Sequence, residues 1–130
     1  MKNNVVIVIF LMLSYCETFT QNLNSEKQLH SNWEFQKKGD KKWYMATVPG
    51  CVHTDLMDNG IINDPYYRLN ESKAQWVDKE DWVYKSTFSL KENEYKKQHH
   101  EIKFEGLDTY ASVYLNDSLI LQSNNMHRTY

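Results

Sequence analysis

The stretch from Trp82 to Leu90 constrains the fold of this chain more than any other segment. Its even-numbered positions are mostly aromatic or aliphatic, and its odd-numbered positions are mostly small or polar. A period of two places alternate side chains on opposite faces of a strand, whereas a helix needs apolar residues every three or four positions. We therefore predict a strand with one buried face here.

Other segments repeat this pattern on a smaller scale, and turn residues separate them. The further predicted strands are Trp33–Gln36, Trp43–Val48 ended by Pro49-Gly50, Ile102–Phe104 closed by Gly106, and the pair Tyr110–Leu115 and Leu119–Gln122. Asn116-Asp117 lies between the last two, and both residue types tolerate the positive φ of a tight hairpin turn. Short strands separated by turns indicate an all-β sandwich.

Two connections interrupt the strands. Val52, Leu56 and Met57 share one helical face, and Gly60 follows at a C-cap position, so we predict a short helix over 52–59. Residues 61–75 show no clean period and form a long, structured crossing loop, a kind of segment that often carries function. Residues 91–100 are charged and are predicted to be an exposed connection.

Length and composition bound the function classes. A chain of 130 residues holds one domain at most, and 41% hydrophobic with 14% aromatic residues supports a packed core. The formal charge is -2 and neither sign forms a long block, so nucleic acid is not an expected partner.

The first 20 residues predict a signal peptide. Lys2 precedes an apolar run, Val5–Leu13, that is too short to span a bilayer, and cleavage after Thr20 leaves a domain over 21–130 without a membrane segment. Lipid attachment at Cys16 is an alternative. The predicted location is secreted or periplasmic, or lysosomal in a eukaryote. Cys51 is then unpaired, and we predict a small buried hydrophobe there.

No cluster of residues predicts catalysis or metal binding. The five histidines are scattered or adjacent, which favours surface positions over a metal site. Asp78, Glu80 and Asp81 form a short acidic run that is typical of a solvated loop rather than of an acid/base pair. Asp108 is predicted to bond nearby backbone amides. We expect no catalytic residue, metal or cofactor in this chain.

Asn70-Glu71-Ser72 and Asn116-Asp117-Ser118 match the N-glycosylation acceptor pattern, which also arises often by chance.

Aromatic side chains of the crossing loop are the candidates for ligand contact. Trp76, beside Tyr66 and Tyr67, could stack on a sugar ring, although core or interdomain packing is the alternative for it; Trp82 is predicted to belong to the core. The candidate substrate-binding residues are Tyr66, Tyr67, Asn70 and Trp76.

From Trp33 to the end, ordered segments of the chain resemble β-mannosidases of glycoside hydrolase family 2. These segments are Val48-Pro49-Gly50-Cys51-Val52-His53-Thr54-Asp55-Leu56, Gly60-Ile61-Ile62-Asn63-Asp64-Pro65-Tyr66-Tyr67-Arg68, Asn70-Glu71, Gln75-Trp76-Val77, Asp81-Trp82-Val83-Tyr84, Phe104-Glu105-Gly106-Leu107-Asp108-Thr109-Tyr110-Ala111, Leu115-Asn116 and Asn125-Met126-His127-Arg128. Related β-galactosidases and β-glucuronidases share fewer of them.

The resemblance implies an N-terminal jelly-roll β-sandwich, galactose-binding-domain-like and incomplete at its C-terminus. It also implies, elsewhere in the parent enzyme, an immunoglobulin-like domain and a catalytic barrel that hydrolyses terminal non-reducing β-D-mannose with retention. The two catalytic carboxylates would lie on that barrel, outside this chain. A free-standing carbohydrate-binding module and a non-sugar interaction domain are the alternatives.

Overall fold

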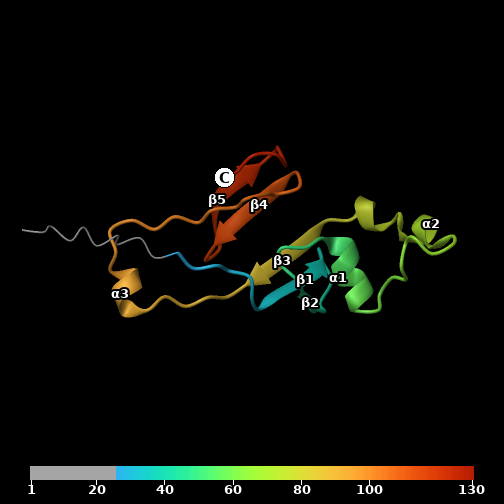
Figure 1. Cartoon of the computed structure of the whole chain (residues 1–130), viewed down its shortest axis with the longest axis horizontal. Coiled ribbons are helices and arrows are strands. Elements are labelled where there is room, and N and C mark those ends of the chain that lie inside the picture. The colour runs from blue at the N-terminus through green and yellow to red at the C-terminus, as the bar shows by residue number, and fades with distance from the viewer. Residues whose placement is uncertain (1–25) are drawn as a thin grey trace, which may run out of the picture.

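The computed structural model describes residues 26–130, and Figure 1 shows their path. The predicted signal peptide and Cys16 lie outside the described residues. The elements in chain order are β1 (Trp33–Lys37), β2 (Tyr44–Ala46), α1 (Val52–Asp58), α2 (Asn70–Ala74), the 3-10 helix η1 (Val77–Lys79), β3 (Trp82–Ser86), α3 (Glu92–Tyr95), β4 (Ala111–Leu115) and β5 (Ser118–Ser123).

The first sheet has the order β2-β1-β3, and all its pairings are antiparallel. Phe35 lies opposite Tyr44 on one side and Tyr84 on the other. β3 is shorter than predicted: it ends at Ser86, because Ser86 faces Trp33, the first residue of the strand it pairs with. Beyond that point β3 has no neighbour for a ladder. The sheet therefore extends only as far as its central strand.

The core lies between one face of this sheet and the connection that crosses it. Phe35, Leu56 and Val77 are its fully buried apolar residues, supplied by β1, α1 and η1. The Phe35 ring lies 5.5 to 6.0 Å from the rings of Tyr44, Trp82 and Tyr84, distances typical of favourable aromatic pairs. The prediction that Trp82 packs in the core is confirmed.

Helix α1 ends as its sequence predicts. Gly60 has a φ of 67°, which glycine adopts without a steric penalty. Its N–H donates to the carbonyl of Met57 at 2.8 Å, and the N–H of Ile61 donates to that of Leu56 at 2.9 Å. These two bonds form a Schellman motif, which satisfies carbonyls at the end of the helix. The chain leaves α1 in a fixed direction as a result.

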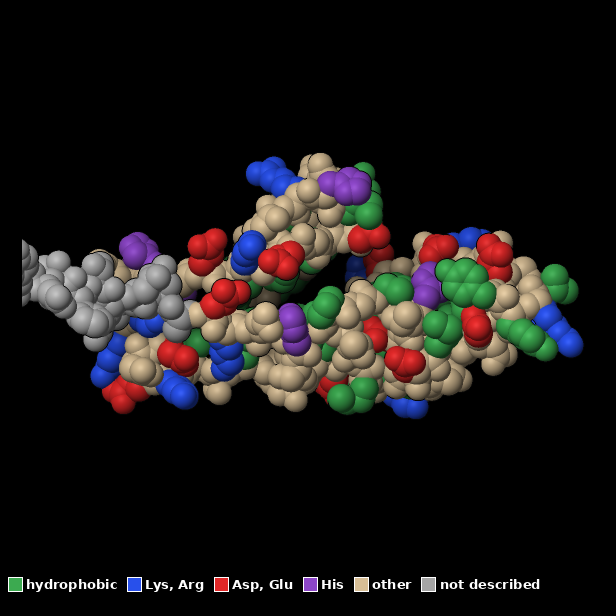
Figure 2. Space-filling model, in the orientation of Figure 1, with side chains coloured by type: hydrophobic (Ala, Val, Ile, Leu, Met, Phe, Trp, Pro, Cys, Tyr) green, Lys and Arg blue, Asp and Glu red, His purple; other side chains and the backbone are tan. Residues whose placement is uncertain are grey.

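Strands β4 and β5 form a separate two-stranded sheet, and the predicted hairpin is confirmed. Asn116 and Asp117 have φ values of 48° and 64°, as the turn requires. At the other end of the hairpin, the hydroxyl of buried Ser123 accepts the N–H of Ala111 and donates to the carbonyl of Thr109. Figure 2 shows the hairpin standing clear of the main body. The two sheets are therefore open, an arrangement consistent with an incomplete β-sandwich.

Several local predictions were wrong. No strand forms over 102–104, because Phe104 exchanges backbone bonds with Tyr130 alone (2.8 and 3.0 Å) and this single pair does not continue. The crossing loop contains α2, which was not predicted, whereas the connection 91–100 is mostly exposed, as predicted, and contains the short helix α3. Cys51 is exposed rather than buried, since it precedes α1 and the core is filled by the residues that follow it. Asp108 accepts the hydroxyl of Thr109 rather than backbone amides.

The part of the chain that the structure describes has no helix that is long and apolar enough to cross a bilayer.

Candidate functional site

The crossing segment 61–75, here named the arm, holds three of the four candidate substrate-binding residues. It leaves the Schellman end of α1, contains α2, and leads into η1. Figure 1 places α2 at one end of the molecule and α3 at the other, so the arm projects from the core. Exposed loops held by a rigid scaffold commonly carry binding residues.

Asp64 organises the tip of the arm. Its carboxylate accepts the N–H of Tyr66 at 2.9 Å, an Asx turn, and its carbonyl accepts the N–H of Tyr67 at 3.1 Å. The same carbonyl accepts the side-chain amide of Asn70 at 3.1 Å. Arg68 follows with a φ of 54°. These bonds hold the tip as a tight loop and turn its side chains outward.

The tip presents aromatic and apolar surface to solvent. Tyr66 is 97% exposed, Leu69 76% and Tyr67 58%. The guanidinium of Arg68 lies over the Tyr67 ring at 5.1 Å, a cation–π contact. Exposed aromatic rings with a polar edge suit both sugar stacking and protein contact.

An open depression of about 630 Å³ lies beside the tip. It is lined by Asn63, Asp64, Tyr67, Arg68, Leu69, Asn70 and Lys73. Two candidate residues, Tyr67 and Asn70, therefore face one concavity together with charged and amide groups. Tyr66 and Trp76 are not part of its lining.

Trp76 lies at the junction of the arm and η1. Its ring is 5.9 Å from that of Trp82 at 46°, while 37% of the side chain is exposed. The indole N–H of Trp82 donates to the carbonyl of Val77 at 3.0 Å. This bond holds in place the Trp82 ring against which Trp76 packs. Trp76 thus packs against Trp82 and remains partly exposed to solvent. The tip residues and Trp76 remain candidates for substrate contact.

Asp55, which the sequence analysis did not single out, anchors the helix from which the arm departs. It is 1% exposed, and its two carboxylate oxygens accept the N–H of Thr47 and the hydroxyl of Tyr84, each at 2.8 Å. Burial and this hydrogen bond raise the pKa of Tyr84 well above its ordinary value. The sequence did contain a signal for this burial: Asp55 lies three residues after Val52 and therefore on the apolar face of α1.

The acidic run before β3 is exposed, as predicted, and each of its members faces a base. Glu80 lies 3.6 Å from Lys37, Asp81 lies 3.0 Å from Lys38, and Asp78 lies 3.8 Å from His53. These acids pair with bases along the sheet and α1. The arrangement differs from a pair of carboxylates facing one substrate.

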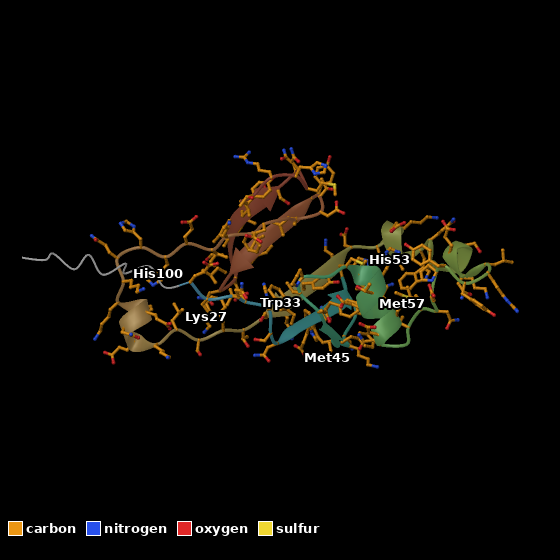
Figure 3. The ribbon with its side chains drawn as sticks, in the orientation of Figure 1. Lys27, Trp33, Met45, His53, Met57 and His100 are labelled. Carbon is orange, nitrogen blue, oxygen red and sulfur yellow. The ribbon has the colours of Figure 1, made fainter. Side chains whose placement is uncertain are left out.

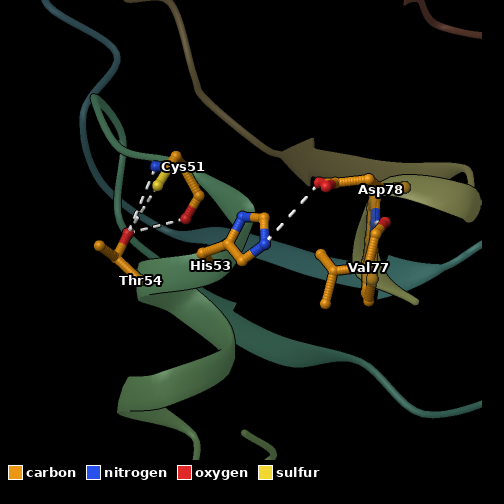
Figure 4. Close-up of polar contacts among 6 residues, drawn as sticks. Cys51, His53, Thr54, Val77 and Asp78 are labelled. Carbon is orange, nitrogen blue, oxygen red and sulfur yellow. Dashed lines mark hydrogen bonds and ion pairs between the residues drawn. The ribbon is translucent and has the colours of Figure 1, made fainter. Parts of the chain in front are cut away.

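Cys51 directly precedes α1, and its thiol lies near the contact between His53 and Asp78 (Figure 4). The Thr54 hydroxyl lies 3.5 Å from the Cys51 sulfur and, with backbone groups nearby, lowers the pKa of the Cys51 thiol. Histidines are dispersed: Figure 3 shows His53 on α1 and His100 at the end that carries α3. Within residues 26–130 no group of three or more His, Cys, Asp or Glu side chains could hold a metal ion.

Comparison with known proteins identifies the domain type. The family model described as glycosyl hydrolase 2 galactose-binding domain-like matches residues 33–130. The chain is 33% identical over 126 residues to the β-mannosidase of Bos taurus and 39% identical over 112 residues to β-mannosidase B of Emericella nidulans. These alignments cover 97% and 83% of this chain, but only 14% and 13% of the relatives.

A solved structure gives the same result. The β-D-mannosidase of Dictyoglomus thermophilum superposes with a TM-score of 0.77 and 45% identity, over 78% of this chain and 13% of that protein. The open sheets thus match one domain of a larger protein, and the predicted galactose-binding-like β-sandwich is confirmed.

Proposed function

The chain belongs to the glycosyl hydrolase 2 galactose-binding domain-like family, and on this basis we propose that it is the N-terminal sugar-binding sandwich of a β-mannosidase. The parent enzyme would hydrolyse terminal non-reducing β-D-mannose residues of β-D-mannosides. The observation that carries the proposal is the 45% identity to the Dictyoglomus β-D-mannosidase over most of the chain.

The chemistry would proceed on residues outside this chain. Retaining glycosidases use an acid/base and a nucleophile whose carboxyl groups lie about 5 Å apart. In this chain, Asp55 is buried against Thr47 and Tyr84, and the acids before β3 face lysines and a histidine. These carboxylates already have partners within the domain. The sandwich would therefore contribute binding surface and not catalytic groups.

The arm is the part of the domain best suited to reach the substrate. Its tip exposes Tyr66 and Tyr67, and the adjoining depression carries Asn70, a donor and acceptor for sugar hydroxyls. Trp76 offers a partly exposed ring at the base of the arm. We assign these four residues to contacts with a β-mannoside or with the catalytic and immunoglobulin-like domains of the parent.

The parent would be exported: secreted or periplasmic, or lysosomal in a eukaryote. The proposal follows from the basic residue and short apolar run among the first 20 residues. N-terminal sequencing of the mature protein tests it, and we expect Gln21 as the first residue.

An activity assay tests whether the catalytic carboxylates lie outside this chain. We expect the purified chain to release no mannose from an aryl β-mannoside, because both carboxylates are supplied elsewhere. Reading the gene downstream of the Tyr130 codon should reveal a barrel with two suitably placed Glu. Turnover by the chain alone would contradict the proposal, and a stop codon in that position would favour a separate binding module.

The second candidate is a free-standing carbohydrate-binding module, which the exposed tyrosines beside the depression favour. It predicts saturable binding of mannobiose to the chain by calorimetry, weakened by Tyr66→Ala and Tyr67→Ala. Tyr95→Ala is the matched control, since Tyr95 is 73% exposed but belongs to α3. Absence of heat at millimolar ligand would eliminate this candidate. Hydrolysis rates of the full-length parent on aryl β-mannoside, β-galactoside and β-glucuronide distinguish a β-mannosidase from a related β-galactosidase or β-glucuronidase.

A further inference from the structure

The two glycosylation motifs of the chain have opposite structural settings. Asn116-Asp117-Ser118 lies at the turn between β4 and β5, and all three residues are exposed. Asn116 has a φ of 48° and lies just beyond Leu115, which pairs with Ser118. In the part of the chain that the structure describes, the Asn116 amide and the Ser118 hydroxyl make no hydrogen bond. Both groups that the motif requires are therefore accessible.

Asn70-Glu71-Ser72 is engaged by its own fold. Asn70 is the first residue of α2 and is half-buried. Its side-chain amide donates to the carbonyl of Asp64 at 3.1 Å, and its backbone N–H donates to the carbonyl of Tyr67 at 3.2 Å. The Ser72 hydroxyl donates to the carbonyl of Leu69 at 2.8 Å. The amide and the hydroxyl of this motif thus already hold the arm together.

We propose that Asn116 accepts an N-linked oligosaccharide when the chain enters an N-glycosylating compartment, and that Asn70 does not. The co-substrate is a lipid-pyrophosphate-linked oligosaccharide. The Asn116 Nδ2 atom forms a bond to the anomeric carbon and loses one proton, while the bond from that carbon to the pyrophosphate oxygen breaks and its electron pair leaves with the lipid pyrophosphate. This inference is independent of the proposed mannosidase activity.

The two sites also differ in what the folded chain could accommodate. A glycan on Asn116 would extend from a turn whose flanking strands are joined by backbone hydrogen bonds, so no contact of the fold would be lost. A glycan on Asn70 would replace an amide hydrogen beside Asp64 and occupy the depression that Tyr67 and Arg68 line. Folding therefore favours occupancy of the hairpin turn.

The experiment expresses residues 1–130 behind a yeast secretion leader and analyses only chain from which the leader has been cleaved, because cleavage proves entry into the lumen. Peptide N-glycosidase converts a glycosylated Asn to Asp, and mass spectrometry locates the conversion. We expect conversion at position 116 and an unmodified Asn70. On a denaturing gel, the glycan should slow the migration of the chain relative to the glycosidase-treated chain. Asn116→Gln and Ser118→Ala should each abolish this mobility shift, and the matched variant Asn70→Gln should retain it.

Two results would overturn the proposal. The first is leader-cleaved wild-type chain without glycan. The second is a shift that persists in Asn116→Gln or a conversion found at position 70.

Discussion

Replacing Asp55 with alanine tests the claim that one buried carboxylate joins α1 to the first sheet. The side chain is 1% exposed and accepts two hydrogen bonds at 2.8 Å, from the Thr47 N–H and the Tyr84 hydroxyl. Asp55→Ala removes both acceptors. The Thr47 N–H, whose bond to Asp55 is part-buried, then loses its partner.

The size of the effect follows from these contacts. A buried donor left without a partner costs about 1–3 kcal/mol, and the half-buried Tyr84 hydroxyl belongs at the lower end because water can reach it. The better helix propensity of alanine offsets about 0.5 kcal/mol. We therefore expect the free energy of unfolding to fall by about 1.5–3.5 kcal/mol.

Urea denaturation followed by tryptophan fluorescence measures this change, because Trp76 and Trp82 lie beside the core. Asp55→Asn should cost about 1 kcal/mol, since its amide can still accept from Thr47 and donate to the tyrosine oxygen but loses the charge. Asp58→Ala is the matched control, on the same helix but exposed. A loss within about 0.5 kcal/mol for Asp55→Ala, the range of ordinary surface substitutions, would refute the reasoning.

Three further predictions follow from the same region. Burial and Asp55 raise the pKa of Tyr84 in the folded state, so the folded state keeps this proton at pH values where the unfolded state loses it. The free energy of unfolding should therefore decline as pH rises above 10. Urea titrations at alkaline pH should show a smaller decline in Tyr84→Phe. Thr54→Val should raise the pKa of Cys51 and slow its alkylation by iodoacetamide at pH 8, whereas Thr54→Ser should preserve the rate; equal rates in all three proteins would contradict the role of the hydroxyl. Phe35→Ala should cost about 3–5 kcal/mol in the same denaturation assay, because its fully buried ring contacts three aromatic neighbours; a loss below about 1 kcal/mol would mean that the core can collapse around the cavity.

Elements with a strong local signal were predictable from the sequence. The alternation around Phe35 and after Trp82 predicts strands because side chains on a pleated backbone alternate between two faces. Gly60 and the Asn116-Asp117 pair predict a helix end and a hairpin turn because few residue types adopt positive φ at low cost. Both signals depend on the chain's own geometry and need no tertiary partner.

Other features depended on partners distant in the sequence. The end of β3 at Ser86 is set by the first residue of β1, and the failure of 102–104 to form a strand is set by a single pairing with Tyr130. The helix α2 lies in a segment without helical periodicity. Local patterns cannot reveal where a neighbouring strand stops.

For the candidate site, the sequence determined which residue types the arm offers, and the tertiary structure decided which of them come together. Tyr67 and Asn70 share one depression, Tyr66 points into solvent, and Trp76 rests on Trp82. The sequence also supplied two equal glycosylation motifs. Only the fold distinguishes them, because hydrogen bonds to Asp64 and Leu69 engage one motif while the hairpin turn leaves the other exposed.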